Sequence, residues 1–298
     1  YDDVAARNPR LVYATISAFG RRGPWRDRPR VDGIVQATGG IMSVTGTEDS
    51  GPVKVGVPAA DMVAGIFASQ AIVAALYARA RTGRGQRVDL SLLEALLAFQ
   101  VVPLSMYLAS GSPPRRLGSA APYSAPNEAY RTADGWIQVA AYTPQRWPRL
   151  CRAIGRPDLV EDPRFVDNPA RVTNRDALRE ELERAFEQRT TKEWIAVLEE
   201  VDVLCAPILG YPELLAEDHL EAIEALPRYD HPEVGELRAV REPATFSETP
   251  ARHRSAAPLR PGEHTREVLG EAGYDDEEIR RLIERGVVEA PEVRKEDP

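Results

Sequence analysis

Asp61 is the residue whose type and position point most directly to chemistry. It follows a loop that contains Gly56 and Pro58, and it immediately precedes a long apolar segment. On spacing alone it is interpreted as a helix N-cap, because its oxygen would accept a backbone N–H that the first turn leaves unpaired. The positive end of a helix also stabilises an anion. Such a carboxylate is able to attack an activated acyl group, so the cap and nucleophile interpretations are compatible.

A basic loop at residues 20–33 is the second feature with chemical potential. Five arginines occur within it: Arg21, Arg22, Arg26, Arg28 and Arg30. Guanidinium groups match phosphate oxygens in a bidentate geometry, and Trp25 offers a face on which a base could stack. Composition alone also fits a solvated loop, so both interpretations stay open.

Composition excludes several classes of protein. The 298 residues carry a net charge of -8, from 38 basic and 46 acidic residues. That balance argues against a general nucleic-acid binder, which needs a basic surface. Cys151 and Cys205 form no CxxC motif, and the four histidines form no metal-binding motif. We therefore expect neither a disulfide framework nor a metal site, and we expect a reducing, cytoplasmic location.

The ends of the chain and two apolar stretches bear on targeting. The chain begins with Tyr1 in what reads as the end of a helix, which suggests that sequence is missing upstream. No basic leader followed by an apolar region is visible. Residues 62–78 and 90–108 are apolar but short and interrupted by polar groups, so we expect buried helices and no membrane span.

The elements around Asp61 follow from periodicity. Residues 11–18 and 86–90 are predicted strands, and residues 61–81 a long helix. Apolar residues at 62, 63, 66, 67, 72, 73, 76 and 77 predict a wide buried face on that helix. Ser91, with Glu94 three residues later, predicts the start of the next helix.

The predicted organisation is α/β with two long extended segments. Residues 1–110 form a partial large domain, and residues 128–225 form a small α+β domain with a hairpin that turns at 133–135. The segments 111–127 and 226–262, rich in Gly, Pro and Ser, are predicted linkers. Residues 263–298 are predicted C-terminal helices that pack back on the large domain.

Several ordered motifs carry a resemblance to a known family. The chain resembles the class III coenzyme A-transferases of the CaiB/BaiF type, which include formyl-CoA transferase, carnitine CoA-transferase and α-methylacyl-CoA racemase. The matching strings are Asn8-Pro9-Arg10-Leu11-Val12-Tyr13, Gly23-Pro24, Asp32-x-x-x-Gln36-Ala37-x-Gly39-Gly40, Thr45-Gly46, Arg81-Thr82-Gly83-Arg84-Gly85-Gln86-Arg87-Val88-Asp89, Asp134-Gly135, Gly155-Arg156-Pro157, Asp162-Pro163-Arg164-Phe165, Asn168-x-x-Arg171 and Gly262-Glu263-His264-Thr265. They span nearly the whole chain in the order of the family.

The resemblance implies a catalytic role for Asp61. It stands where the family keeps its nucleophilic aspartate, which forms an anhydride and then a thioester while CoA moves from an acyl-CoA donor to a carboxylic acid. Asp32 stands where formyl-CoA transferases carry a carboxylate near the nucleophile, and a loop cap or a solvated charge is its alternative interpretation. Acyl-CoA and the acid are then substrates, and no permanently bound cofactor is implied.

Two weaker assignments come from the same resemblance. Arg28 and Arg30 flank Pro29, which aligns with a basic residue that contacts CoA in formyl-CoA transferases. Gly118 and Ser119 lie in the area of a substrate loop, but the glycine run of formyl-CoA transferases is absent. Oxalate and formate are therefore not the expected substrates, and a larger carboxylic acid is favoured: a dicarboxylate, a carnitine-like acid or an aromatic acid.

The family also supplies the alternatives. A racemase would need a His where this chain has Val31 and a Glu where it has Thr143. Because two acid/base groups are required for that chemistry, transfer is favoured over racemisation. A truncated, inactive or partner-binding protein is the other alternative. The family fold implies a Rossmann-like large domain joined to the small domain in an interlocked homodimer.

Overall fold

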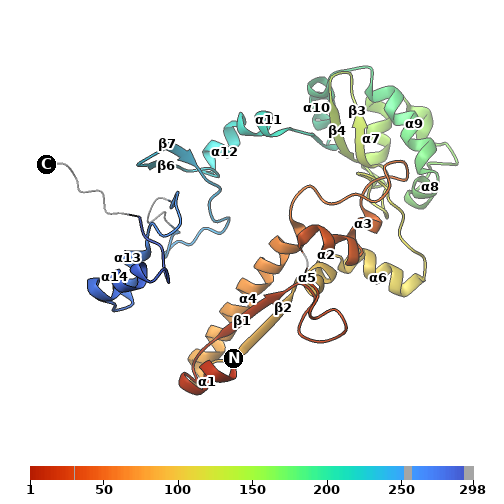
Figure 1. Cartoon of the computed structure of the whole chain (residues 1–298). Helices are drawn as coiled ribbons and strands as arrows, with labels where there is room; N and C mark the ends of the chain where they lie inside the picture. The colour runs from red at the N-terminus through yellow and green to blue at the C-terminus, as the bar shows by residue number, and fades with distance from the viewer. Residues whose placement is uncertain (30, 252–256, 292–298) are drawn as a thin grey trace. The chain divides into compact units, whose positions relative to one another are not determined.

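The chain combines helices and sheets in two compact units. The computed structural model describes residues 1–29, 31–251 and 257–291. The units are Tyr1–Ile208 and Leu209–Pro298. Both units contain helices and short strands (Figure 1). The mixture of helix and sheet expected from the sequence is therefore confirmed.

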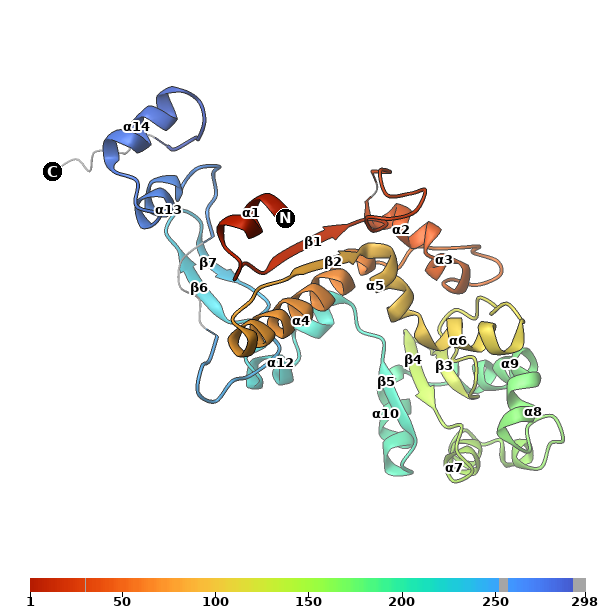
Figure 2. The ribbon, with the colours of Figure 1, turned by 90° about the horizontal axis from the view of Figure 1, so that it is seen from below.

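The first unit opens with two parallel strands and the helix that connects them. Strand β1 (Tyr13–Ser17) pairs with β2 (Arg87–Ser91) in the register Tyr13↔Arg87 to Ser17↔Ser91. Parallel neighbours need a long crossover, and helix α4 (Ala59–Thr82) lies within this one. It runs beside both strands (Figures 1 and 2). Both strands and the long helix lie where the sequence predicts them.

Glycines allow the return from α4 to β2. Gly83 ends the helix in a left-handed conformation, with φ of +74°, and its N–H bonds to the Arg79 carbonyl. A Cβ at Gly85 would lie 2.0 Å from the Leu11 carbonyl oxygen, so only glycine permits this approach. The glycines of the string at 81–89 therefore have a structural function.

The buried face of α4 differs from the prediction. Its buried residues are all alanines: Ala59, Ala60, Ala64, Ala68 and Ala75. The larger apolar side chains point outward, and Met62, Ile66, Val73 and Tyr77 are 60–66% exposed. The predicted wide buried face is therefore wrong for the described part of the chain. The helix is apolar on several sides, and α5 and α2 pack against the side with small residues.

Helix α4 also bears on the question of membranes. By length and composition it is apolar enough to cross one, and the bent pair α5 (Leu92–Phe99) and α6 (Val101–Ser110) passes the same test if counted as a single span. Core helices of soluble proteins meet this criterion as well, so the observation is weak evidence for a membrane.

A small apolar cluster fixes the helices around the start of α4. It consists of Val35, Ile41, Ala60 and Leu96, from α2 (Asp32–Thr38), α3 (Ile41–Val44), α4 and α5. The Gln100 amide ties α2 to α5, because its Nε2 donates to the carbonyls of Gly39 at 2.9 Å and Leu96 at 3.0 Å. The short helix α1 (Asp2–Arg7) precedes β1.

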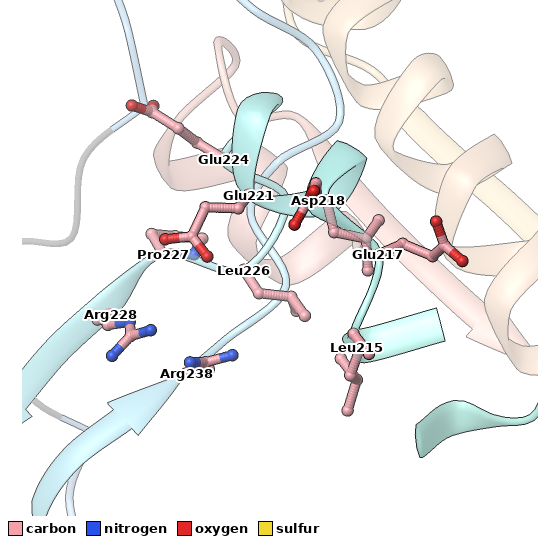
Figure 3. Close-up of a pocket in the computed structure, with 11 residues that line it drawn as sticks. Leu215, Glu217, Asp218, Glu221, Glu224, Leu226, Pro227, Arg228 and Arg238 are labelled. Carbon is pink, nitrogen blue, oxygen red and sulfur yellow. The ribbon is translucent and has the colours of Figure 1, made fainter. Parts of the chain in front are cut away.

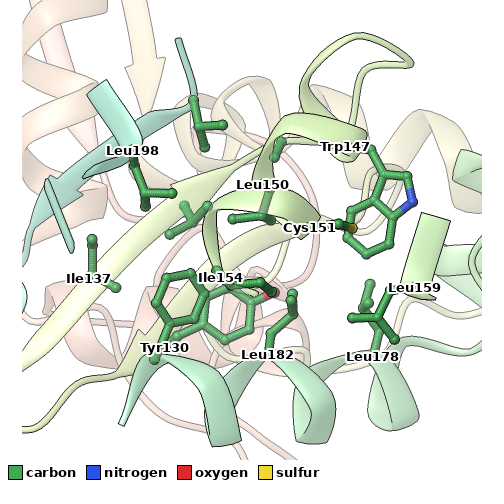
Figure 4. Close-up of a cluster of buried hydrophobic side chains, with 14 of the residues drawn as sticks. Tyr130, Ile137, Trp147, Leu150, Cys151, Ile154, Leu159, Leu178, Leu182 and Leu198 are labelled. Atoms are coloured by element: carbon green, nitrogen blue, oxygen red, sulfur yellow. The ribbon is translucent and has the colours of Figure 1, made fainter. Parts of the chain in front are cut away.

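The remainder of the first unit is built on a three-stranded antiparallel sheet. Its strands are β3 (Asn127–Arg131), β4 (Trp136–Ala140) and β5 (Leu204–Pro207), in the order β3-β4-β5. The helices are α7 (Arg146–Ala153), the 3-10 helix η1 (Pro157–Val160), α8 (Asn168–Thr173), α9 (Arg175–Phe186) and α10 (Thr191–Glu200). Their apolar faces meet the sheet in one core, in which Tyr130, Leu150, Leu178 and Leu182 are fully buried (Figure 4). The hairpin turn at 133–135 is confirmed.

The second unit holds shorter elements. They are α11 (Tyr211–Leu215), α12 (Asp218–Ala222), the antiparallel strands β6 (Arg228–His231) and β7 (Gly235–Arg238), α13 (Thr265–Glu271) and α14 (Asp276–Glu284). The segment 226–262 thus contains a β-hairpin. Both predicted C-terminal helices are present, and Asp275 caps α14 by accepting the Glu278 N–H at 2.8 Å.

Candidate active site

Asp61 lies at the third position of α4 with its side chain exposed. The helix begins at Ala59 with Pro58 at the N-cap, so the N-cap interpretation of Asp61 is wrong. Among the described residues, its carboxylate has no hydrogen-bond or ion-pair partner. A carboxylate in this place is open to solvent, and it experiences the positive potential of a long helix.

The cap of α4 comes instead from Asp32, far away in the sequence. The Asp32 side chain is 8% exposed. Its Oδ1 accepts the Ala60 N–H at 2.8 Å and the Asp61 N–H at 3.4 Å. Asp32 therefore supplies from a distant segment what an N-cap residue normally supplies from its own helix. Of the predicted site residues, Asp32 is the one that the described structure places in contact with Asp61.

Gln36 completes this arrangement, and its role was not predicted from the sequence. It is fully buried one turn after Asp32. Its Nε2 donates to Asp32 Oδ2 at 2.7 Å and to the Val57 carbonyl at 3.2 Å, and its Oε1 accepts the Val55 N–H at 3.0 Å. The Asp32–Gln36 spacing of four residues was the available signal, because side chains at i and i+4 meet on a helix.

The backbone donors at the start of α4 are already used. The Ala59 N–H bonds to the Val57 carbonyl at 2.8 Å. The next two N–H groups, from Ala60 and Asp61, bond to Asp32. A tetrahedral oxyanion formed at Asp61 therefore needs hydrogen-bond donors from elsewhere.

The basic loop is held by its aromatic residue. The Trp25 ring packs edge-on against Phe19, with ring centroids 5.2 Å apart, and the Arg28 guanidinium lies 5.7 Å from the Trp25 ring centroid. Arg28 and Arg22 are exposed. Arg30 lies outside the described residues. Trp25 thus has an intramolecular contact on its edge and a cation over its ring, and the exposed Arg28 guanidinium remains accessible to an anion.

Gly118 and Ser119 join two parts of the first unit. The Gly118 N–H donates to the Gly46 carbonyl at 2.8 Å, and the Ser119 Oγ accepts the Ala129 N–H at 2.9 Å. Gly118 has a φ of +63°, which favours glycine. It also lines an apolar cavity of about 220 Å³ together with Val44, Val102, Pro103, Leu117 and Tyr123.

The motif at residues 81–89 ends in Asp89, a carboxylate with a structural function. Asp89 on β2 accepts a hydrogen bond from Thr15 Oγ1 on β1 at 2.5 Å and another from Arg87 Nε at 2.9 Å. The bond from Thr15, with help from Arg87, lowers the pKa of Asp89. Asp89 therefore remains ionised and ties the two parallel strands together.

Neither cysteine has the character of a nucleophile. Burial raises the pKa of the Cys151 thiol to about 12, and burial also raises the pKa of Cys205. Within the described ranges, no group of three or more His, Cys, Asp or Glu side chains is arranged to hold a metal ion. Neither cysteine therefore offers an alternative to the exposed Asp61 carboxylate.

A separate cavity of about 430 Å³ lies in the second unit. Figure 3 shows Arg228 and Arg238 on one side of it, with Asp218 and Glu221 of α12 on the other. The apolar residues Leu215, Leu220 and Leu226 also line it. None of the site residues predicted from the sequence lies in this cavity.

The motif residues of the small sheet module are structural. Arg171 is 2% exposed, and it donates to the carbonyls of Ala125 at 2.7 Å, Phe165 at 2.9 Å and Tyr142 at 2.9 Å. Asn168 bonds to the Ala125 N–H through Oδ1 at 3.0 Å. These bonds hold the segment before β3 against α8.

Comparison with known proteins agrees with the sequence motifs. Residues 1–265 match the family described as CoA-transferase family III. An acyl-CoA transferase of Fusarium pseudograminearum is 35% identical over 97% of this chain, which spans 63% of that protein. An acetyl-CoA:oxalate CoA-transferase of Acetobacter aceti is 39% identical over 72% of this chain, and the matched part covers 55% of that protein.

A solved structure gives the same result. The crystal structure of a CaiB/BaiF family protein from Brucella suis superposes with a TM-score of 0.78 at 34% identity, covering 91% of this chain and 70% of that one. Sequence and fold therefore agree over most of the chain. The chain belongs to CoA-transferase family III.

Proposed function

We propose that this protein transfers coenzyme A from an acyl-CoA donor to a carboxylic acid, with Asp61 as the nucleophile. The observation that carries the proposal is the exposed Asp61 carboxylate at the start of α4, held through its backbone by Asp32. A carboxylate with no competing partner among the described residues is free to attack.

The proposed reaction uses Asp61 twice as an acyl carrier. One carboxylate oxygen attacks the thioester carbonyl carbon, the C–S bond breaks, and CoA leaves as thiolate. The thiolate then attacks the Asp61 carbonyl of the mixed anhydride, which releases the donor acid as carboxylate. The acceptor carboxylate attacks the resulting aspartyl thioester and again expels thiolate. Attack of this thiolate on the acceptor carbonyl forms the product and frees Asp61.

The names of related proteins support a chemical class for the carboxylic acid that accepts CoA. Relatives include a succinyl-CoA:glutarate CoA-transferase of Mus musculus, 30% identical, and a succinyl-CoA--D-citramalate CoA-transferase of Chloroflexus aurantiacus, 31% identical. Glutarate and citramalate are dicarboxylic acids larger than oxalate. Other relatives name oxalate: an acetyl-CoA:oxalate CoA-transferase at 39% identity and a formyl-CoA:oxalate CoA-transferase of Streptomyces coelicolor at 35%. All of these acceptors are dicarboxylic acids, so we propose a dicarboxylic acid as acceptor. The absence of a glycine run near Gly118 favours one larger than oxalate.

The proposal also covers how CoA and the acyl chain bind and how the protein assembles. The exposed Arg28 guanidinium, packed on Trp25, is suited to a phosphate of CoA. The Gly118–Ser119 segment beside the apolar cavity is suited to an acyl chain. A Rossmann-like large domain and an interlocked homodimer are the arrangement that the family resemblance implies.

The racemase alternative finds no support at the two positions that decide it. Val31 is 70% exposed and apolar. Thr143 accepts the Arg146 N–H through Oγ1 at 3.3 Å, as a residue before a helix commonly does. Neither side chain titrates near neutral pH, so neither is able to move an α-proton.

Trapping of the acyl-enzyme tests the proposal. The chain is incubated with succinyl-CoA, glutarate and hydroxylamine, and peptide mass spectrometry reads the hydroxamate at residue 61. We expect modification of Asp61 in the parent and a loss of transfer of about 10³-fold or more in Asp61→Asn. Asp49→Asn, in the exposed loop before α4, is the matched control and should retain transfer.

Two results would contradict the nucleophile assignment. One is transfer by Asp61→Asn at a rate near that of the parent. The other is transfer by the parent with no hydroxamate at residue 61. A panel of oxalate, glutarate and citramalate as acceptors, with products identified by mass, tests the acceptor class separately.

A further inference from the structure

We propose that Gln36 is a positioning residue for Asp61, acting through Asp32 and through the loop that precedes α4. The Asp32 and Gln36 side chains, with their bonds to Val55, Val57, Ala60 and Asp61, form what we call the Asp32–Gln36 clamp. The inference rests on the proposed role of Asp61, and it assigns a function to a residue that touches neither substrate nor Asp61 itself.

Gln36 is the centre of the clamp because its amide is fully used. Its side chain is 0% exposed, and its bonds reach α2 and the loop before α4. The loop segment from Val55 to Val57 is thereby tied to α2 at both of these residues. A buried amide with all its near neighbours satisfied is rigid, since breaking any bond leaves a buried polar group unpaired.

The chemistry of the site selects glutamine. Its Nε2 faces two acceptors, the Asp32 carboxylate and the Val57 carbonyl, while its Oε1 faces one donor, the Val55 N–H. Only an amide offers donors at one end and an acceptor at the other in this shape. An ionised glutamate would place negative charge against two acceptors. A leucine or methionine would leave the Val55 N–H without its acceptor and would take the Nε2 donor from Asp32 Oδ2 and from the Val57 carbonyl.

The clamp controls Asp61 because that side chain has no other support. Its carboxylate lacks a partner within the described residues, so its location follows from the backbone at the start of α4. That backbone is held by Asp32 Oδ1, which bonds to the N–H groups of Ala60 and Asp61. A displacement of about 1 Å at a reacting group lowers a rate about 10²-fold, so a loosened clamp should slow attack by Asp61.

The clamp also defines what Asp32 does. Both of its oxygens are engaged, Oδ1 with two backbone N–H groups and Oδ2 with Gln36. Its two oxygens are thus occupied by the cap of α4 and by Gln36. The geometry therefore assigns Asp32 to positioning, and it leaves Asp61 as the single reacting carboxylate of the pair.

Gln36→Glu turns the clamp into a pH-sensitive pair. With one shared proton, the two carboxyls form an O–H···O bond that replaces the bond from Nε2. Loss of that proton leaves two buried anions about 2.7 Å apart, which repel each other and open the clamp. The elements around it carry further charged groups, among them Lys54 before α4, Asp61 on α4 and Glu94 on α5. The Glu94 carboxylate accepts a hydrogen bond from Ser91 Oγ at 2.5 Å.

The expected result is a rate that falls as pH rises. We expect the hydroxamate-forming rate of Gln36→Glu, divided by that of the parent at the same pH, to fall by about tenfold per pH unit above the upper pKa of the pair. Hydrogen exchange of the peptide covering residues 55–62 should rise over the same pH range. Gln70→Glu is the matched control: it adds the same charge on the exposed surface of α4, and its ratio should stay constant.

A double variant separates positioning from simple loss of folding. In Asp32→Asn the new side chain keeps an oxygen for the cap but turns its amide toward Nε2 of Gln36, so two donors meet. Adding Gln36→Glu restores a donor and an acceptor at that contact. We expect Asp32→Asn with Gln36→Glu to be at least about tenfold faster in acyl capture at neutral pH than Asp32→Asn alone.

The outcomes distinguish this inference from the proposed function. No hydroxamate at Asp61 in the parent would refute the nucleophile assignment, while the exchange measurement would still report on the clamp. Capture by the parent together with a ratio for Gln36→Glu that does not change with pH would refute the positioning role. If Gln36→Glu does not fold, a double variant no faster than Asp32→Asn refutes it instead.

Discussion

At the scale of single residues, buried polar side chains have the largest influence on this structure. Asp32, Gln36 and Arg171 are all under 9% exposed, and each bonds to main-chain groups from other segments. Such residues look unremarkable in a sequence, because polarity normally predicts exposure. Their burial is stable only because every donor and acceptor finds a partner.

Arg171→Met gives a prediction at this scale. The substitution leaves three carbonyls without their donor: those of Ala125 and Phe165, whose bonds are buried, and that of Tyr142, whose bond is partly buried. We expect the free energy of unfolding of the first unit to fall by about 3 kcal/mol or more, as measured by urea denaturation.

Arg164→Met is the matched control for Arg171→Met. Its guanidinium is 49% exposed and pairs with Asp162 at the surface, so we expect a change of about 1 kcal/mol or less. Equal losses for the two variants would mean that the buried bonds of Arg171 contribute no more than a surface ion pair does.

At the scale of secondary-structure elements, the sequence predicts a feature well where its signal is local. It predicts a feature poorly where the partner lies in a distant segment. Ser91 caps α5 as expected, since its Oγ accepts the Glu94 N–H at 3.1 Å. The start of α4 was misassigned because its cap, Asp32, lies 28 residues before Ala60. The buried face of α4 was misassigned because periodicity does not reveal which side a neighbouring helix approaches.

Two glycine-to-alanine variants test the packing of these elements, and we expect one to lower the stability and the other to raise it. Gly85→Ala places a Cβ 2.0 Å from the Leu11 carbonyl oxygen, so the strand and the turn must separate. We expect a loss of about 1–3 kcal/mol in the free energy of unfolding. Gly65→Ala, inside α4 with no heavy atom within 4 Å of the new Cβ, should raise stability by about 0.5–1 kcal/mol.

Denaturation in urea at one pH measures both glycine variants. A neutral effect of Gly85→Ala would show that β1 and the turn after α4 relax without cost. A destabilising Gly65→Ala would show that the outward side of α4 is covered in solution.

At the scale of the whole molecule, the dependence of stability on pH follows from carboxylates whose pKa is lowered by folding. The first unit contains several aspartates with a lowered pKa: Asp89, Asp134, Asp158, Asp162 and Asp202. Their main causes are hydrogen bonds, from Thr15 for Asp89, from the Thr191 backbone for Asp134, and from arginines for the rest. The bonds to Asp89, Asp134 and Asp202 join segments that are distant in the sequence, whereas those to Asp158 and Asp162 come from arginines two residues away.

Acid should therefore destabilise the first unit. A carboxylate whose pKa is lowered by folding stabilises the native state above its ordinary pKa of 3.8, and this contribution is lost as pH falls below that value. We expect the thermal unfolding midpoint to be lower at about pH 3 than at about pH 5. Asp134→Asn should show a smaller pH dependence than the parent, and an unchanged dependence would exclude a contribution from Asp134.

The sequence by itself determined the family, the two parallel strands with the helix between them, and the prominence of Asp61. Motif spacing and periodicity are local properties, and they persist in any structure that the chain adopts. Only the tertiary structure decided that Asp32 caps the helix of Asp61, that Gln36 holds both segments, and that alanines form the buried side of α4. The physical reason is that these contacts join segments that are distant in the chain, so their partners are defined only once the fold has brought them together.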